Sequence, residues 1–309
     1  MRINIPENQQ LFGENATCFN AFAYMQTWLN VIVRKFPNRY RFGVVDNIDG
    51  MEANYIYNIV NHFMTLFQLC AVTPDYSAAV GLCRSLADRI AALKLVFENE
   101  DIAEREYRYY LFILDGFQLR QSMLSDEVKK SNRITDEEFN ALSKQMNDAR
   151  KNANDVVTFC LDKLNNHKYA TDYPEFHTAV IKKATWQFRK VGVLAKKNGI
   201  PSYTWNDMYT LLDHRSEIQS LYSRYCSQFV HGLSMTLLPN NDRDNFESLM
   251  SVGVCLQGEI MSILKKKYAN PNILRQDFSD YDFQLILSQL DNDYIRKIIE
   301  DFNNSIKQE

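Results

Sequence analysis

The chain has 309 residues, of which 46% are hydrophobic and 24% charged, so it is long enough to bury a sizeable core and too apolar to be disordered throughout. Its formal net charge of −3 gives no overall attraction for nucleic acid, so any contact with RNA has to come from a local basic patch. Only 10 glycines and 7 prolines interrupt it, which favours long helices over a many-turned β fold. The sequence therefore predicts an all-α, multi-helix bundle of roughly nine to eleven helices.

The six cysteines are scattered without a CxxC pair, which is typical of a reduced, cytoplasmic protein rather than of a disulfide framework or a zinc site. No stretch approaches the ~20 apolar residues of a membrane span, and the N-terminus MRINIPENQQ has no apolar signal core. We therefore expect a cytoplasmic protein that does not enter a membrane. The absence of a low-complexity linker predicts one helical domain over residues 1–309.

Apolar residues recur at helical spacing along most of the chain, and the expected helices follow in order. The first three cover 16–36, 51–72 and 74–98. The third is expected to start with Thr73 as its capping residue and Pro74 at its first position.

A helical hairpin is expected over residues 101–166. Its first helix, 101–128, opens with the charged turns EDIAEREYRYY, which indicate a solvated face. Its second helix, 136–166, opens with a capping box of Thr135 and Glu138 and is polar nearly all round in its middle. Such a pair of helices predicts a hairpin that projects from the domain or pairs with another chain.

Basic and aromatic residues alternate in the window 182–197, which holds no acidic residue. Trp186 and Phe188 lie among the basic residues, a mixture that is typical of a contact with single-stranded RNA. An ordinary solvated face is the alternative. The basic residues of this predicted RNA contact are Lys182, Lys183, Arg189, Lys190, Lys196 and Lys197.

One long helix over 215–236 carries a polar stripe on a single side: Arg224, Ser227, Gln228 and His231. Residues seven apart fall on nearly the same side of a helix, about 10 Å apart along its axis. These groups could bind a phosphate, and the imidazole alone could exchange protons near neutral pH. In the alternative interpretation His231 is half-buried and bonded to a neighbouring helix, while Arg224 extends to solvent.

The remaining helices are expected near 204–212, near 243–268 and within 280–308. Arg84 and Asp88 lie four positions apart inside the apolar 74–98 helix, so they can form an ion pair. That pair is either a buried structural bridge or part of a functional site.

Other kinds of chemistry are excluded by spacing. Cys226 and His231 point about 140° apart on a helix, so they are not a nucleophile and its base. The chain has no HExxH motif, P-loop or GxGxxG turn, so we expect neither a metal nor a cofactor.

Two stretches, LCRSLADRIAALKLVFENEDIAEREYRYYLF and LYSRYCSQFVHGLS, resemble an uncharacterised group of helical bacterial proteins classed as a domain of unknown function. Those proteins carry an R-S-L-x-E helix and a later Tyr…Ser-x-x-x-His-Gly segment. The resemblance covers about half of the chain. Asp88 stands here at the acidic position, and the second motif is matched by Tyr222, Ser227, His231 and Gly232.

The chain also resembles HEPN domains, which are helical bundles with an arginine and a histidine on a late helix, separated by four to six intervening residues. In active members these two residues of two protomers meet across a dimer interface and cleave RNA. Arg224 and His231 match this motif at its longest spacing, with Tyr225 where active members usually have a polar residue.

The second resemblance implies a metal-independent ribonuclease of phage defence or toxin type that acts as a homodimer. His231 would be the general acid or base and Arg224 would stabilise the phosphorane, while the basic window holds the strand. The other members of the phosphate-binding or polar-network set are Ser227, Gln228, Tyr222, Arg84 and Asp88. The competing hypothesis is a non-enzymatic interaction module in which Arg84, Asp88 and His231 form a buried polar lock.

Overall fold

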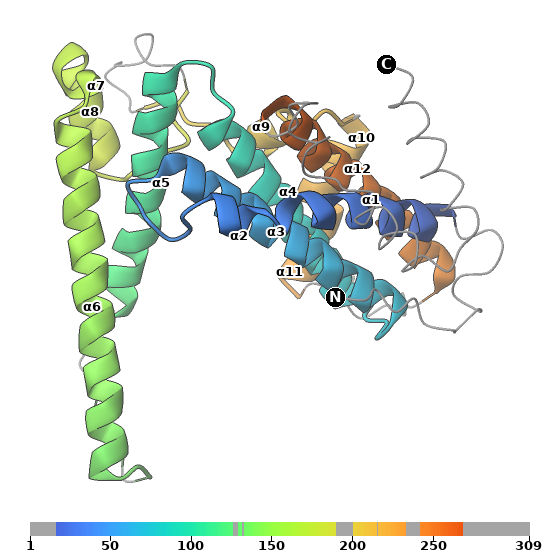
Figure 1. Cartoon of the computed structure of the whole chain (residues 1–309), viewed down its shortest axis with the longest axis horizontal. Coiled ribbons are helices and arrows are strands. Elements are labelled where there is room, and N and C mark those ends of the chain that lie inside the picture. The colour runs from blue at the N-terminus through green and yellow to red at the C-terminus, as the bar shows by residue number, and fades with distance from the viewer. Residues whose placement is uncertain are drawn as a thin grey trace. The chain divides into compact units, whose positions relative to one another are not determined.

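The computed structural model describes residues 17–125, 129–131, 133–189, 200–214, 216–232 and 242–267. These residues form helices and contain no strand, only an isolated antiparallel bridge between Phe188 and Ser202. The prediction of an all-α, multi-helix protein is therefore confirmed (Figure 1). The helices expected within 280–308 lie outside the described residues.

The described part of the chain contains twelve helical segments. Most of them match the predicted ranges within a few residues. They are α1 Thr17–Val33, α2 Phe36–Arg39, α3 Ile48–Ala71, α4 Tyr76–Phe97, α5 Ile102–Met123, α6 Asp136–Asn165, α7 Lys168–Asp172, α8 Pro174–Ile181, α9 Trp205–Tyr209, α10 Ser216–Ser223, α11 Tyr225–Val230 and α12 Arg243–Lys267. None of these helices is long and apolar enough to cross a membrane.

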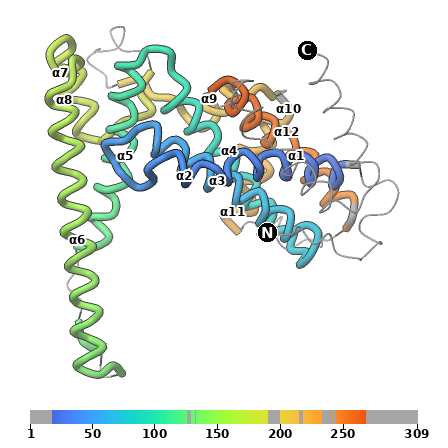
Figure 2. Tube along the Cα trace, viewed as in Figure 1, coloured from blue at the N-terminus to red at the C-terminus, as the bar shows by residue number. Residues whose placement is uncertain are grey.

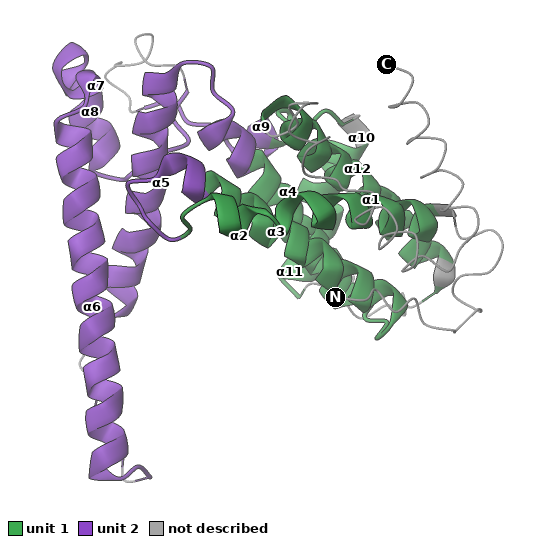
Figure 3. Ribbon diagram, in the orientation of Figure 1, with its two compact units in different colours: residues 1–42, 52–91, 209–309 green, residues 43–51, 92–208 purple. Residues whose placement is uncertain are grey.

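The chain forms two compact units, which Figure 3 distinguishes by colour. Unit 1 comprises residues 1–42, 52–91 and 209–309, and unit 2 comprises 43–51 and 92–208. Each unit has its own buried apolar side chains.

In unit 1, α1 packs along α12, although the two helices come from opposite ends of the described chain (Figure 2). The buried amide of Gln257 in α12 donates to the carbonyl oxygen of Phe22 at 3.3 Å and to Oε1 of Gln26 at 3.0 Å. The contact is close because residue 253 is glycine: a Cβ there would lie 2.6 Å from the ring of Phe22. These interactions fix α1 against α12 over the core of the unit.

The start of α4 differs from the predicted one. The helix begins at Tyr76, and Asp75 caps it because its carboxylate accepts a hydrogen bond from the N–H of Ala78 at 3.0 Å. The predicted Thr73 cap is therefore wrong. Thr73 instead follows the end of α3, where its N–H donates to the carbonyl oxygen of Gln68 at 2.9 Å.

In unit 2, α5 and α6 pack together as the two arms of a hairpin. The predicted capping box is present, with the N–H of Glu138 donating to the hydroxyl of Thr135 at 3.2 Å. The buried residues of α6 begin only at Ala153. The half of the helix next to the turn is therefore polar and largely exposed to solvent. That half of the hairpin is held by polar contacts such as the hydrogen bond from Nε of Arg150 to the carbonyl oxygen of Leu124.

Candidate functional site

The predicted helix over 215–236 is not continuous. It is interrupted at Arg224, so that α10 ends at Ser223 and α11 begins at Tyr225. The backbone of Arg224 keeps a nearly helical conformation (φ −101°, ψ −63°), and its N–H donates to the carbonyl oxygen of Ser220 at 3.0 Å. The interruption is therefore a local break in one helical path, and residues 233–236 lie outside the described part.

The side chain of Arg84, which comes from α4, contacts the backbone next to this break. Its Nη1 donates to the carbonyl oxygen of Tyr222 at 2.5 Å. A side chain that inserts into the hydrogen-bond ladder of a helix is a known cause of kinks. The contact gives a physical reason why the predicted single helix is divided shortly after Tyr222.

Arg84 is itself held by two partners. Its Nε donates to Oδ1 of Asp88 at 2.9 Å, and its guanidinium lies 5.1 Å from the ring centre of Tyr209. The hydroxyl of Tyr209 also donates to Oδ1 of Asp88. We call these four residues, Arg84, Asp88, Tyr209 and Tyr222, the Arg84 network.

The network is largely withdrawn from solvent. The side chains of Arg84 and Asp88 are 14% and 28% exposed, and both tyrosines are buried. Burial raises the pKa of Tyr209 and of Tyr222 well above the ordinary tyrosine value, so both hydroxyls stay protonated and can donate.

A second buried polar contact continues from Tyr222. Its hydroxyl lies 3.2 Å from Nδ1 of His214, whose Nε2 lies 3.3 Å from a carboxylate oxygen of Glu259. That carboxylate also accepts the N–H of Asp213 at 2.5 Å. Tyr209, His214 and Glu259 could not be predicted as members of this site, because nothing in their local sequence distinguishes them from other polar residues.

Arg224 and His231 stand at the two ends of α11, and both are exposed. Gly232 follows His231 with a positive φ of 61°, and its N–H donates to the carbonyl oxygen of Phe229 at 3.2 Å, so α11 ends there. The other two members of the predicted stripe, Ser227 and Gln228, are half-buried.

The opposite side of α11 faces the core. Cys226 and Phe229 are buried, and the hydroxyl of Tyr225 lies 3.0 Å from that of Tyr76 in α4. Burial raises the pKa of the Cys226 thiol to about 12, so it is not a nucleophile at neutral pH.

The structure therefore brings some predicted site residues together and keeps others apart. Arg84, Asp88 and Tyr222 meet in one bonded network. His231 is not in a buried lock with Arg84 and Asp88, because its side chain is exposed to solvent.

The predicted RNA contact lies in unit 2 and is only partly described. Lys182, Lys183 and Arg189 are exposed, whereas Lys190, Lys196 and Lys197 lie outside the described residues. Arg189 pairs with Asp207 at 2.7 Å and lies over the ring of Tyr203, with 5.0 Å to the ring centre.

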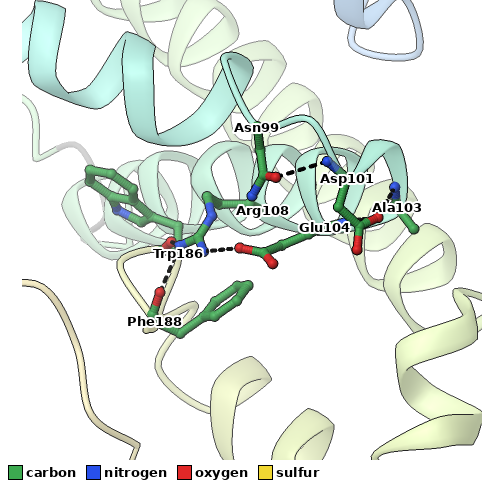
Figure 4. Close-up of polar contacts among 7 residues, drawn as sticks. All are labelled: Asn99, Asp101, Ala103, Glu104, Arg108, Trp186 and Phe188. Carbon is green, nitrogen blue, oxygen red and sulfur yellow. Dashed lines mark hydrogen bonds and ion pairs between the residues drawn. The ribbon is translucent and has the colours of Figure 1, made fainter. Parts of the chain in front are cut away.

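The aromatic residues of the same window are not available for stacking on bases. Trp186 and Phe188 are 7% and 0% exposed. The interpretation of this window as a surface of mixed basic and aromatic residues is therefore wrong for its aromatic residues. Their carbonyl oxygens accept hydrogen bonds from Nη1 of Arg108 at 2.6 and 2.8 Å (Figure 4). These contacts hold the segment against α5.

The expectation that the charged start of α5 is a solvated face is wrong for Arg108. Its side chain is 2% exposed, pairs with Glu104 at 2.5 Å and covers the ring of Phe188 at 3.8 Å. Burial lowers the pKa of Arg108, and the hydrogen bond that Arg108 donates to Glu104 opposes that effect. A charge run in the sequence thus includes one arginine that belongs to the core.

Comparisons of the chain with models of protein families, with curated proteins and with solved structures found no match. Among the side chains that the structure describes, no group of three or more His, Cys, Asp or Glu residues could hold a metal ion.

Proposed function

We propose that unit 1 carries a metal-independent ribonuclease site whose catalytic residues are Arg224 and His231. The observation that carries this proposal is that both side chains are exposed at the two ends of α11 while the other side of that helix is buried. Seven positions of helical path separate them by about 10 Å on one side, which leaves room for a phosphodiester between them.

In the proposed reaction the 2′-oxygen of a ribose forms a bond to phosphorus while the bond to the 5′-oxygen breaks. His231 accepts the proton of the 2′-hydroxyl, and Arg224 stabilises the charge on the phosphorane. The leaving 5′-oxygen takes a proton from the protonated His231 of a second copy. The products are a 2′,3′-cyclic phosphate and a 5′-hydroxyl, and water returns both histidines to their starting state.

A homodimer supplies the second histidine, as the HEPN-like motif implies. Ser227 and Gln228 of unit 1 position the phosphate that reacts. Within unit 2, exposed basic residues such as Lys182 and Lys183 are proposed contacts for RNA phosphates.

The test is a cleavage assay on 5′-labelled single-stranded RNA with the full chain and a metal chelator. We expect cleavage to products with a 2′,3′-cyclic phosphate, and no cleavage of the DNA of the same sequence, which lacks the 2′-hydroxyl. His231→Ala and Arg224→Ala should each lower the rate by about a hundredfold or more.

His62→Ala is the matched control, because this half-buried histidine lies on α3, where its Nδ1 lies 2.6 Å from the carbonyl oxygen of Asn58. It should retain full activity. Equal activity of His231→Ala and the wild type would show that a contaminant cleaves the RNA, and the ribonuclease proposal would then be abandoned.

The second candidate function is a non-enzymatic helical interaction module. The Arg84 network supports this second candidate, because a hydrogen-bonded network of this kind can stabilise a structure without taking part in catalysis. Under this proposal the pure protein cleaves no RNA, and substitution of Arg224 or His231 changes neither its stability nor its oligomeric state.

A further inference from the structure

Helix α4 contacts the chain on both sides of the break at Arg224. On the α10 side, Nη1 of Arg84 donates to the carbonyl oxygen of Tyr222 at 2.5 Å. On the α11 side, the hydroxyls of Tyr76 and Tyr225 lie 3.0 Å apart, and the rings of Tyr76 and Phe229 are 5.6 Å apart. The same helix therefore supports both pieces of the interrupted path.

The Arg84 contact competes directly with helix continuation. In an unbroken α-helix the carbonyl of Tyr222 would accept the N–H of Cys226, four residues later. A guanidinium nitrogen at 2.5 Å is a charged donor to that oxygen, and charge-assisted hydrogen bonds are about twice as strong as neutral ones. The carbonyl is thereby bound to α4 at the point where α10 ends.

The geometry requires an arginine. One nitrogen of the guanidinium, Nε, is bound to Asp88, another binds the carbonyl of Tyr222, and its central carbon lies over the ring of Tyr209, 5.1 Å from the ring centre. A lysine ammonium has neither the planar fork nor the stacking face, so it cannot make these contacts together.

We propose that Arg84 is a positioning residue that sets the break between α10 and α11 and so determines how Arg224 and His231 are presented at the surface. It does not touch the substrate. Its effect on catalysis rests on the ribonuclease proposed above, whereas its effect on the backbone of α10 and α11 does not.

The test compares Arg84→Lys and Arg84→Met with the wild type by hydrogen–deuterium exchange and mass spectrometry. Both variants should lower the exchange of the amides next to the break, above all that of Cys226, by about tenfold or more, because the freed carbonyl oxygen of Tyr222 can then accept the N–H of Cys226. In the cleavage assay both should lower kcat by about tenfold and leave KM within about twofold, since Arg84 does not bind RNA. Lysine should not rescue either effect.

Arg89→Lys is the matched control, because this residue lies on the same helix and its Nη1 is 3.3 Å from Nδ1 of His62, away from the break. It should leave exchange within 221–230 unchanged. Unchanged exchange in both Arg84 variants would overturn the inference, as would an increase spread evenly over unit 1, which would assign Arg84 to general stability. If the wild type cleaves no RNA, the ribonuclease proposal fails, and the exchange data still decide the role of Arg84.

Discussion

Tyr209 and Arg84 share one acceptor, because the tyrosine hydroxyl and Nε of Arg84 both donate to Oδ1 of Asp88. Asp88→Asn removes the charge that both donors face, and we expect it to lower the free energy of unfolding by about 1–3 kcal/mol. Tyr209→Phe removes one donor and should cost about 1 kcal/mol. Urea unfolding measures both. Tyr173→Phe, at a residue 39% exposed in unit 2, should change stability by less than about 0.5 kcal/mol.

In unit 2, Arg108→Met should be among the most destabilising single changes. It leaves Glu104 and the carbonyl oxygens of Trp186 and Phe188 without their donor, and removing one partner of a buried pair costs about 3–5 kcal/mol. Arg120→Met, at an exposed position of the same helix, should cost less than about 0.5 kcal/mol. Thermal unfolding of the two variants separates them, and equal melting temperatures would contradict the structural role of Arg108.

We expect the free energy of unfolding to fall in mild acid because of two histidines of unit 2. His167 caps α7, its Nδ1 accepting the N–H of Tyr169 at 3.1 Å, and Nδ1 of His177 lies 2.8 Å from the hydroxyl of Tyr107. Burial lowers the pKa of both imidazoles below the ordinary value of about 6.5. The unfolded chain therefore binds protons first, and stability should be complete above about pH 6.5 and fall as the pH drops from there towards the lower folded pKa values.

This pH dependence is measured as the urea midpoint between pH 7.5 and pH 5. The double variant His167→Asn, His177→Gln keeps a capping side chain without a titrating ring, so its midpoint should fall less than that of the wild type. Identical pH profiles of the two proteins would show that other groups cause the acid sensitivity.

Two glycine substitutions should act in opposite directions. Gly232→Ala places a Cβ on a residue with φ of 61°, which should cost about 1 kcal/mol and lower RNA cleavage, because α11 no longer stops cleanly after His231. Gly81→Ala lies within α4, where an added Cβ meets no atom within 4 Å, and should stabilise the protein by about 0.4–1 kcal/mol. Urea unfolding tests both, and a stabilising Gly232→Ala would contradict the described end of α11.

The exposed lysines of unit 2 give a prediction about RNA binding. Lys182→Ala with Lys183→Ala should weaken binding and reduce the slope of log K against log salt by about 2, because each lysine releases about one counterion. Lys144→Ala with Lys151→Ala changes the same charge at exposed positions of α6 and should leave the slope unchanged. Fluorescence anisotropy across a salt series distinguishes the two pairs, and equal slopes would place the RNA contact elsewhere.

The fold class could be predicted because helix periodicity and capping residues are local. The Thr135 and Glu138 capping box, for example, is formed entirely within three positions and is present as expected. The break at Arg224 could not be predicted, since its cause is the side chain of Arg84, 138 positions away. Periodicity describes one helix at a time and contains no information about which side chain of another helix will bind its backbone.

For the candidate residues, the sequence predicted a local ion pair better than it predicted burial. Arg84 and Asp88 form the expected ion pair, and Tyr222 joins them through its carbonyl oxygen rather than its hydroxyl. The window around Trp186 and Phe188 was misjudged because a mixture of basic and aromatic residues has the same composition on a surface as at the edge of a core. Burial there depends on Arg108, which satisfies the backbone carbonyls of the segment.

The pairing of α1 with α12 also affects how the protein is made. Gln26 and Gln257, which join the two helices, are 231 positions apart. At ribosomal rates α1 waits about 10 to 50 s for its partner to be synthesised. During that interval Phe22 can already pack on Phe63 and Phe67 of α3, but the side of its ring that lies against Gly253 of α12 stays uncovered.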